Sequence, residues 1–337
     1  MSLATKYRPA VFEDVCSQKA VVDVLKKQVE TNTFANAYIL CGASGCGKTT
    51  LARIMANMIN KGAGNPIEID AASNNGVDNI RAIMDDAKQR AVDSVYKIYI
   101  VDECHVLSNQ AWQAALKGIE ETPKYTIFFF CTTNPEKIPA TIINRCMKFQ
   151  LNRIPSNIIC ERLNYICKSE GYTNYEDTCD YISRICNGEM RLGISLLEKV
   201  SAYSTSLSTD MTLQILGNVS YGTMIDLINN LIDGNEGKVL GILNEVNDTG
   251  IDLRIWVNSF IQFVIDVQKV LLLNDINCTR LPVSLVEPIK GITNFDTAKD
   301  YYFYLLNNML ELKNMINKDV DPFSTIQIIM MKVSRCK

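Results

Sequence analysis

The sequence has a single histidine, His105, among its 337 residues. One imidazole cannot build a metal site of several histidines, and it leaves no second imidazole for a catalytic triad. Twelve cysteines are present, but none form the Cys-x-x-Cys spacing of zinc and redox sites. We therefore expect reduced cysteines that act as small buried apolar side chains in a reducing compartment.

Long apolar runs are also lacking. Runs such as residues 127–131 are far shorter than the roughly 20 residues that span a bilayer, and the N-terminus leads into no apolar segment of a secretory signal. Nine prolines and seventeen glycines argue against a collagen-like or low-complexity chain. The sequence predicts a soluble, cytoplasmic protein with no membrane partner, and its length predicts two or three domains.

The net charge is only −3, and it is unevenly distributed. Residues 1–154 carry 18 basic and 15 acidic side chains, whereas residues 155–337 carry 16 basic and 22 acidic ones. This distribution is unlike that of a histone-like binder. It leaves open a local phosphate-binding stripe on the first part of the chain.

Short apolar segments alternate with helical patterns over the first 150 residues. We expect strands at 37–41, 66–70, 97–102 and 126–133, and helices at 50–60, 77–92 and 108–121. Strands this apolar, alternating with helices, predict a parallel sheet covered on both faces. After residue 154 almost only amphipathic helical periodicity remains, interrupted by a polar connector at 203–209, which predicts two all-helical pieces.

Residues 42–49 (Gly-Ala-Ser-Gly-Cys-Gly-Lys-Thr) match the phosphate-loop pattern G-x-x-x-x-G-K-[ST] without a mismatch. Glycines let backbone N–H groups turn toward phosphates, and the following helix adds the positive end of its dipole. We expect Lys48 to reach the β- and γ-phosphates and the Thr49 hydroxyl to bind Mg²⁺. The loop follows a predicted strand and opens a predicted helix, as this motif requires.

Polar side chains follow two of the predicted strands. Asp102 and Glu103 end the strand at 97–102, where open α/β sheets bind ligands, so Asp102 is expected toward the metal and Glu103 toward the attacking water. An exposed acidic turn is the alternative, and the phosphate loop about fifty residues earlier disfavours it. Thr133 ends the next strand, where it would hydrogen-bond the γ-phosphate or water, although a threonine there is more often a turn former.

Further short motifs accompany these two in a fixed order. They are residues 6–9, 12–15, 68–73, 102–105, 115–123, 132–135, 144–146 and 188–191. With the phosphate loop, they resemble AAA+ ATPases, and specifically clamp-loader subunits of the gamma/tau type of bacterial DNA polymerase III. The resemblance is dense over residues 1–200 and only architectural beyond them.

The resemblance implies an α/β AAA+ core with a parallel sheet over residues 1–154. An all-helical lid over 155–218 and an all-helical collar for oligomerisation over 219–337 would follow. ATP and Mg²⁺ are the implied cofactors, with Thr49 and Asp102 binding the metal. The implied catalytic residues are Lys48, Asp102, Glu103, Thr133, Arg145 and Arg191. The implied nucleotide-binding residues are Tyr7, Arg8, Pro9, Val15, Gly42, Ser44, Gly45, Cys46, Gly47, Lys48, Thr49, Thr50 and Arg191.

Several of these roles come from the resemblance alone. Residues 6–9 would line the adenine and ribose pocket, and Thr133 would be sensor 1. Arg145 matches the family's arginine finger, which reaches the γ-phosphate of a neighbouring subunit, whereas outside this motif a solvated surface arginine would be the simpler interpretation. Arg191 resembles sensor 2, a lid arginine that contacts the γ-phosphate.

Two departures from the family pattern stand out. Asn144 replaces the family's serine before the arginine finger, a small polar change that bears on inter-subunit geometry. Residues 57–66 contain no cysteine where the bacterial subunit carries a four-cysteine zinc module, so no zinc is expected. Because the chain ends soon after the collar, without the tau tail, we expect a compact, phage-like form, which if phage-encoded would act in the host cytoplasm.

The implied partners are other clamp-loader subunits in a ring or spiral, five by family precedent, together with a sliding clamp and primer–template DNA. The implied DNA-binding residues, which would contact phosphates without reading bases, are Asn74, Asn75, Ser108, Asn109 and Lys117. A polar helix start such as Ser108 is otherwise a simple N-cap. The clamp is expected at the end of the predicted helix 77–92 and the loop 93–96, unless Tyr96 belongs to the core.

The sequence thus predicts an ATP-hydrolysing motor subunit that opens a sliding clamp and places it on primer–template DNA during replication. A helicase-loader or initiator-type AAA+ ATPase is one alternative, but it would need an additional DNA-binding domain, which we do not find. A non-hydrolysing scaffold subunit of a replication complex is another, but such subunits typically lose site residues that are all present here. A metabolic kinase would need neither Arg145 nor a large helical C-terminal half.

Overall fold

The computed structural model describes residues 2–216, 219–273, 279, 281, 285–292, 295–316 and 321–335. Two compact units are present, and each is described by itself. Unit 1 comprises Met1–Arg162 with Cys186–Ser195, and unit 2 comprises Leu163–Ile185 with Leu196–Lys337. The sequence led us to expect three domains, 1–154, 155–218 and 219–337, and the two units divide the chain differently. The boundaries of the three domains stay a prediction.

Unit 1 is built on a five-stranded sheet in the order β2-β3-β4-β1-β5, with every pair parallel. The strands are β1 (Ala37–Cys41), β2 (Ile67–Asp70), β3 (Lys97–Asp102), β4 (Thr126–Thr132) and β5 (Met147–Gln150). The first four confirm the strands predicted from the sequence. β5 was not predicted, because it is only four residues long and mostly exposed at the sheet edge.

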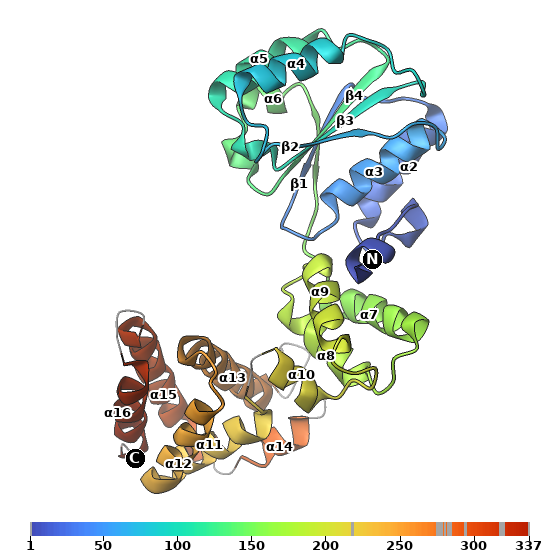
Figure 1. Cartoon of the computed structure of the whole chain (residues 1–337). Coiled ribbons are helices and arrows are strands. Elements are labelled where there is room, and N and C mark those ends of the chain that lie inside the picture. Colours follow the sequence, from blue (N-terminus) through green and yellow to red (C-terminus); the bar gives the residue numbers. More distant parts are fainter. Residues whose placement is uncertain are drawn as a thin grey trace. The chain divides into compact units, whose positions relative to one another are not determined.

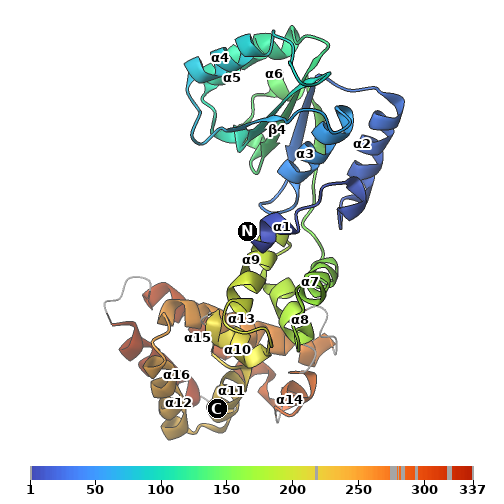
Figure 2. The ribbon, with the colours of Figure 1, turned by 45° about the vertical axis from the view of Figure 1, so that its right-hand side comes forward.

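Helices cover both faces of this sheet (Figures 1 and 2). Side chains alternate between the faces along each strand. Tyr38 and Leu40 of β1 pack in a core with α2 (Lys19–Thr31) and α3 (Lys48–Ile59). Ile39 of β1 packs on the opposite face. The helices there are α4 (Val77–Asp86), α5 (Asn109–Glu120) and α6 (Ala140–Ile143). The predicted parallel sheet with two covered faces is therefore confirmed.

The helix predicted over 77–92 is too long, because α4 ends at Asp86. Side chains at the starts of β3 and β4 donate hydrogen bonds to the backbone carbonyls of the last helical residue and the two residues after it. Lys97 Nζ donates to Asp86 O, Thr126 Oγ1 to Ala87 O and the Tyr125 hydroxyl to Lys88 O. These bonds draw the chain toward the ends of β3 and β4 instead of continuing the helix.

The α5 N-cap agrees with the prediction, since Ser108 Oγ accepts the Ala111 N–H at 3.1 Å. The remaining short elements of unit 1 are α1 (Leu3–Lys6) and three 3₁₀ turns, η1 (Phe12–Asp14), η2 (Cys104–Val106) and η3 (Pro135–Lys137).

After β5 the regular elements among the described residues are helices, apart from one β-bridge. This bridge pairs Thr173 with Ser206, which lies in the predicted connector. The helices are α7 (Ser156–Glu170), α8 (Glu176–Ile185), α9 (Met190–Ser201), α10 (Thr209–Ile215), α11 (Tyr221–Asp233), α12 (Glu236–Asp248), α13 (Leu253–Leu273), α14 (Val286–Lys290), α15 (Phe295–Ile316) and α16 (Pro322–Arg335). The expected all-helical second half is confirmed for these residues.

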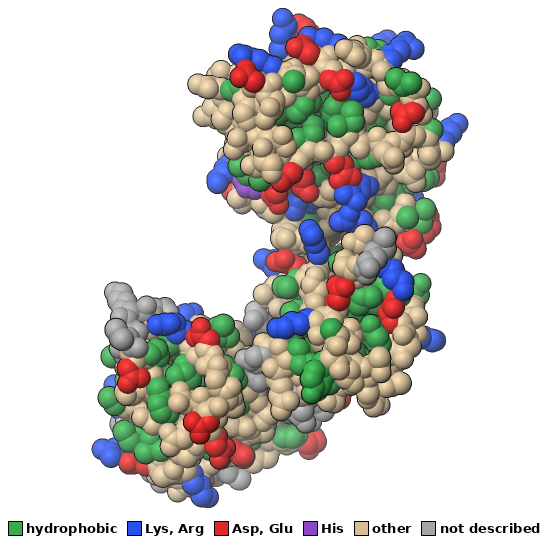
Figure 3. Space-filling view, viewed as in Figure 1, with side chains coloured by type: hydrophobic (Ala, Val, Ile, Leu, Met, Phe, Trp, Pro, Cys, Tyr) green, Lys and Arg blue, Asp and Glu red, His purple; other side chains and the backbone are tan. Residues whose placement is uncertain are grey.

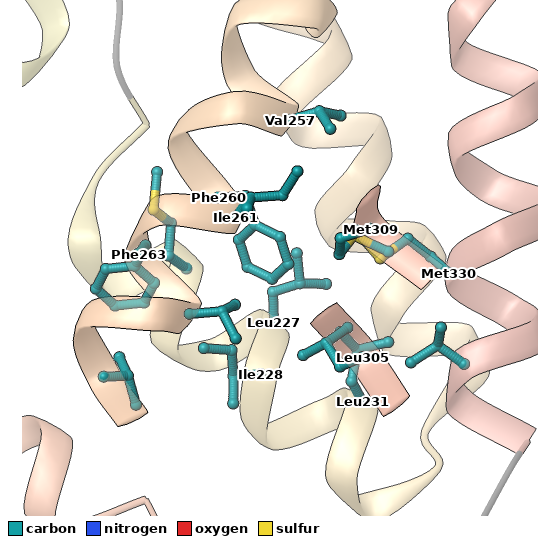
Figure 4. Close-up of a cluster of buried hydrophobic side chains, with 14 of the residues drawn as sticks. Leu227, Ile228, Leu231, Val257, Phe260, Ile261, Phe263, Leu305, Met309 and Met330 are labelled. Carbon is teal, nitrogen blue, oxygen red and sulfur yellow. The ribbon is translucent and has the colours of Figure 1, made fainter. Parts of the chain in front are cut away.

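Apolar side chains of α11, α12, α13, α15 and α16 pack into one core in unit 2, and Figure 4 labels members from α11, α13, α15 and α16. Phe260 of α13 lies at its centre, fully buried and stacked on Trp256 with ring centroids 5.6 Å apart. By length and composition α13 could cross a membrane, but half of its apolar window is buried inside the structure. A helix buried in the core of a helical bundle is expected to have this composition.

We expect Phe260→Ala to lower the free energy of unfolding by about 3–5 kcal/mol, because it removes a buried ring and leaves a cavity. Phe303→Ala is the matched control, since that ring on α15 is 67% exposed and its loss should cost far less. Urea unfolding followed by circular dichroism compares the two. Equal destabilisation would contradict the packing described for α13.

Candidate nucleotide site

The phosphate loop connects β1 to α3 and requires glycine at two of its positions. Gly42 has φ +156°, and a Cβ there would lie 2.6 Å from Leu151 O, closer than real Cβ contacts allow. Gly45 has φ +63°, in the left-handed region, and a Cβ would lie 3.0 Å from Glu189 Cβ. The loop backbone thus turns tightly against residues that flank it in unit 1.

Lys48 and Thr49 open α3 directly after this loop. Lys48 is only 6% exposed, and its Nζ donates to Gly42 O at 3.0 Å and Ala43 O at 2.9 Å. Thr49 Oγ1 donates to Asp102 Oδ2 at 2.8 Å. The helix and the end of β3 therefore bring a hydroxyl and a carboxylate together beside a buried ammonium group.

These residues fit a triphosphate with Mg²⁺. Hydroxyl and carboxylate oxygens are the ligands that Mg²⁺ takes, and it usually retains waters and substrate phosphates in its shell. In the described part of the chain, no group of three or more His, Cys, Asp or Glu side chains is placed to hold a metal ion. Thr49 and Asp102 would thus hold Mg²⁺ jointly with the phosphates. The absence of zinc stays a prediction.

Glu103 lies beside this pair in a strained conformation. Its φ is +48°, in the left-handed region that a non-glycine residue seldom adopts, and its N–H donates to Asp102 Oδ1 at 2.9 Å. Thr133 Oγ1 donates to Glu103 Oε2 at 3.2 Å, and His105 Nδ1 lies 3.2 Å from the same oxygen. The ends of β3 and β4 thus place Asp102, Glu103 and Thr133 together, as the sequence led us to expect.

A pocket lies along the phosphate loop within unit 1. It is lined by Tyr7, Arg8, Pro9 and Val15, by Ser44 to Thr50, and by Asp102, Glu103 and Arg191. Apart from Gly42, which shapes the loop, every predicted nucleotide-binding residue lines this pocket. Thr133 does not line it and reaches the pocket through Glu103.

Sequence reasoning missed several other lining residues, most of which lie outside the recognised motifs. Gln18 pairs with the backbone of Asn152, accepting from its N–H at 3.1 Å and donating to its carbonyl at 2.7 Å. Arg162 Nη2 donates to Tyr7 O at 2.9 Å. The pocket is also lined by Ser2, Ala4, Thr5, Cys16, Ser17, Leu51, Ile154, Met190 and Ile194. Each contact joins segments far apart in sequence, so no local pattern signals it.

Arg8 and Arg191 both line the pocket. The pKa of Arg8 is lowered, first by burial and then by the nearby charges of Arg53 and Arg191. Arg53 is held by Glu68 on β2 at 2.5 Å. Repulsion between these positive charges disfavours the charged form of Arg8, and a polyanion bound in the pocket would offset this repulsion.

The cysteines near the site are buried and neutral. Burial raises the pKa of the Cys46 thiol in the loop, and raises the pKa values of Cys104 and Cys131 behind the carboxylates well above the ordinary range. Thiols with raised pKa values are poor nucleophiles. They serve as small apolar side chains here, as the sequence predicted.

Arg145 does not line this pocket. It follows α6, its side chain is 40% exposed, and it is held by two contacts within unit 1: Nη2 lies 2.5 Å from Glu120 Oε1, and Nη1 donates to Thr141 O at 2.7 Å. The structure therefore does not bring Arg145 to the chain's own phosphate loop, and its action on a neighbouring subunit stays a prediction.

The predicted DNA contacts are separate polar positions rather than a basic surface. Asn74 and Asn75 lie in a turn that follows β2. The backbone carbonyl of Asp70 accepts the Asn74 N–H at 3.1 Å and so orders this turn. Ser108 caps α5, while Asn109 and Lys117 are exposed on that helix. On the face shown in Figure 3, basic and acidic side chains are mixed over unit 1.

The predicted clamp contact divides into a buried and an exposed part. The backbone of Tyr96 pairs with the Asn60 side chain, and its ring packs edge-on against Phe34 with centroids 5.5 Å apart. Tyr96 is therefore partly buried and packs against the core on the α2 and α3 face of the sheet. Val92 and Val95 are strongly exposed.

Comparison with known proteins points to one family. Residues 65–155 match the family model "DNA polymerase III, delta subunit", and residues 207–284 match "DNA polymerase III subunits gamma and tau domain III". DNA polymerase III subunit tau of Bacillus subtilis is 38% identical over 73% of this chain, and the gamma/tau subunit of Mycoplasma genitalium is 29% identical over 92%. The chain spans 48% and 55% of those two proteins, about half their length.

A shorter relative is covered more fully. DNA polymerase III subunit gamma of Buchnera aphidicola subsp. Schizaphis graminum is 32% identical, over 78% of this chain and 77% of that protein. Among solved structures, Thermotoga maritima RuvB, described as a Holliday junction branch migration motor, matches 73% of this chain and 86% of its own with a TM-score of 0.53 at 16% identity. That likeness concerns the fold alone, and with the parallel sheet it confirms the AAA+ fold class expected from the sequence.

Proposed function

Because the chain belongs to the DNA polymerase III gamma/tau family, we propose that it is an ATP-hydrolysing motor subunit of a sliding-clamp loader. In this proposal, ATP binding assembles the chain with other subunits into a spiral, five by family precedent, that holds an opened clamp. Primer–template DNA then triggers hydrolysis and release. The observation that carries the proposal is the arrangement of Lys48, Thr49, Asp102 and Glu103 along one pocket.

Binding of ATP falls to the phosphate loop and the N-terminal segment. Lys48 would exchange the loop carbonyls that it now contacts for the β- and γ-phosphates, and Tyr7 to Pro9 with Val15 would enclose the base and ribose. Mg²⁺, held by Thr49 and Asp102, would neutralise charge on the β- and γ-phosphates. Arg191 reaches the same pocket from α9 and would report that ATP is bound.

Hydrolysis needs a positioned water and compensation of charge. Glu103 would orient the water and accept its proton as the new bond to the γ-phosphorus forms and the bond to the β-phosphate oxygen breaks. Thr133 holds the Glu103 carboxylate through its hydroxyl, which supports a role in sensing the nucleotide. Arg145 would supply positive charge to a neighbouring subunit's nucleotide.

Contacts to DNA and clamp come from outside the pocket. Asn74, Asn75, Ser108, Asn109 and Lys117 would contact DNA phosphates without reading sequence, so binding would weaken as salt rises. The exposed Val92 and Val95 would meet an apolar groove of the clamp. Residues 155–218 would act as the lid and residues 219–337 as the collar, in a protein of the cytoplasm.

The test is ATP-dependent placement of labelled clamp on primed circular DNA by the assembled complex. We expect clamp to remain on the DNA with ATP, whereas a non-hydrolysable ATP analogue should leave the loader bound with the clamp. The non-hydrolysing scaffold is the competing function. Normal clamp placement by a complex in which this chain carries Lys48→Ala would favour it.

A further inference from the structure

We propose that Glu120 is a positioning residue for Arg145: it holds the guanidinium in the orientation from which it reaches a nucleotide bound by a neighbouring subunit. The inference rests on the proposed function, since it concerns how one chain prepares a group for use in another.

Two different elements hold the guanidinium. Glu120 is the last residue of α5, and its Oε1 lies 2.5 Å from Arg145 Nη2. Thr141, on α6, accepts from Nη1 through its carbonyl at 2.7 Å. A planar group held at two of its nitrogens by two elements has a defined plane as well as a defined position.

Both anchors lie next to residues of the buried core. Ile119, next to Glu120, and Ile142, next to Thr141, are buried in the same core on one face of the sheet. The backbone N–H of Arg145 donates to Ile142 O at 3.0 Å. The Arg145 side chain is 40% exposed, and its described contacts are to residues of α5 and α6, so these two helices set its orientation.

The pair leaves the guanidinium able to bind a phosphate. Arginine has five N–H donors, and these contacts engage two of its three nitrogens. An arginine that is already oriented loses less freedom when it engages the γ-phosphate, and transition-state contacts depend steeply on such placement. The simple alternative is an ordinary surface ion pair. Such pairs contribute little to stability.

The experiment uses the assembled complex with its clamp and primed DNA, and measures steady-state ATP hydrolysis, nucleotide binding and oligomeric state for each variant. Arg145→Ala should lower kcat by about 10³-fold. Glu120→Ala should lower kcat by about 10-fold while KM for ATP stays within about twofold, because placement rather than binding is lost. Glu120→Gln should fall between, since its amide oxygen still accepts from Nη2.

A double-mutant cycle separates positioning from a general structural role. In an Arg145→Ala background, Glu120→Ala should have no further effect, because the group that it positions is gone. Glu121→Ala is the matched control: that exposed glutamate is the next residue along the chain, makes no ion pair with Arg145, and should leave the rate unchanged.

Two outcomes overturn the inference in different ways. If Glu120→Ala hydrolyses ATP like the wild type, or costs the same with and without Arg145, Glu120 does not position the arginine, and the proposed function stands. If Arg145→Ala itself retains the wild-type rate in an intact complex, the trans-acting role in the proposed function fails, and the role of Glu120 fails with it.

Discussion

Replacing Lys48 with alanine is expected to weaken ATP binding by at least about 100-fold, since charge-assisted hydrogen bonds contribute about 1.5–3 kcal/mol each. The ammonium group is buried in the phosphate loop and contacts the carbonyls of Gly42 and Ala43, so the cation that would meet the phosphates is already in place. Isothermal titration calorimetry with ATP and Mg²⁺ measures the change.

Lys124→Ala serves as the control. Lys124 is an exposed lysine outside the pocket, and its replacement removes the same charge from the protein. Circular dichroism establishes that the Lys48 variant keeps its helices. ATP binding by a folded Lys48→Ala protein at the wild-type affinity would contradict the assignment of the loop as the triphosphate site.

Glu103→Gln is expected to lower ATP hydrolysis by about 10²–10⁴-fold while leaving ATP binding close to that of the wild type. The amide has nearly the same shape and its oxygen can still accept from Thr133, but it cannot take a proton from water. Binding and turnover therefore separate in this variant, whereas they fall together in Lys48→Ala.

The matching control is Glu30→Gln, an exposed glutamate on α2 that changes the net charge equally. Phosphate release is measured under multiple-turnover conditions for both variants. A Glu103→Gln protein that turns over ATP at the wild-type rate would show that another group orients the water.

The central strands β1, β3 and β4 were predictable because each is short, apolar and almost wholly buried. Tyr38 to Cys41 are fully buried, and such runs carry a clear signal in sequence. β5 gave no such signal, since Met147, Lys148 and Gln150 are exposed. The end of α4 was misjudged because its termination depends on bonds from Lys97, Tyr125 and Thr126, which are distant in sequence.

In the candidate site, too, some residues could be predicted from the sequence and others could not. Lys48, Thr49, Asp102 and Glu103 lie in local motifs whose spacing follows from one loop and one strand end, and the structure places them along one pocket. Contacts between segments that are far apart in sequence follow no fixed spacing and could not be predicted. The Gln18–Asn152 contact spans 134 residues and the Arg162–Tyr7 contact 155, and each depends on how the whole of unit 1 packs.

The ion pair of Glu120 with Arg145 also needed the structure. In sequence, Glu120 is one of two adjacent glutamates before Pro123, and nothing local distinguishes it from Glu121. Only the packing of α6 against α5 assigns the arginine to one of them.

Steady-state ATP hydrolysis by the assembled complex, with and without clamp and primer–template DNA, tests the central claim most directly. We predict a low basal rate that rises when clamp and primed DNA are added together, and no such rise when this chain carries Glu103→Gln. A rate that stays negligible and unchanged in every condition would contradict the motor and favour a scaffold in which ATP only orders the assembly.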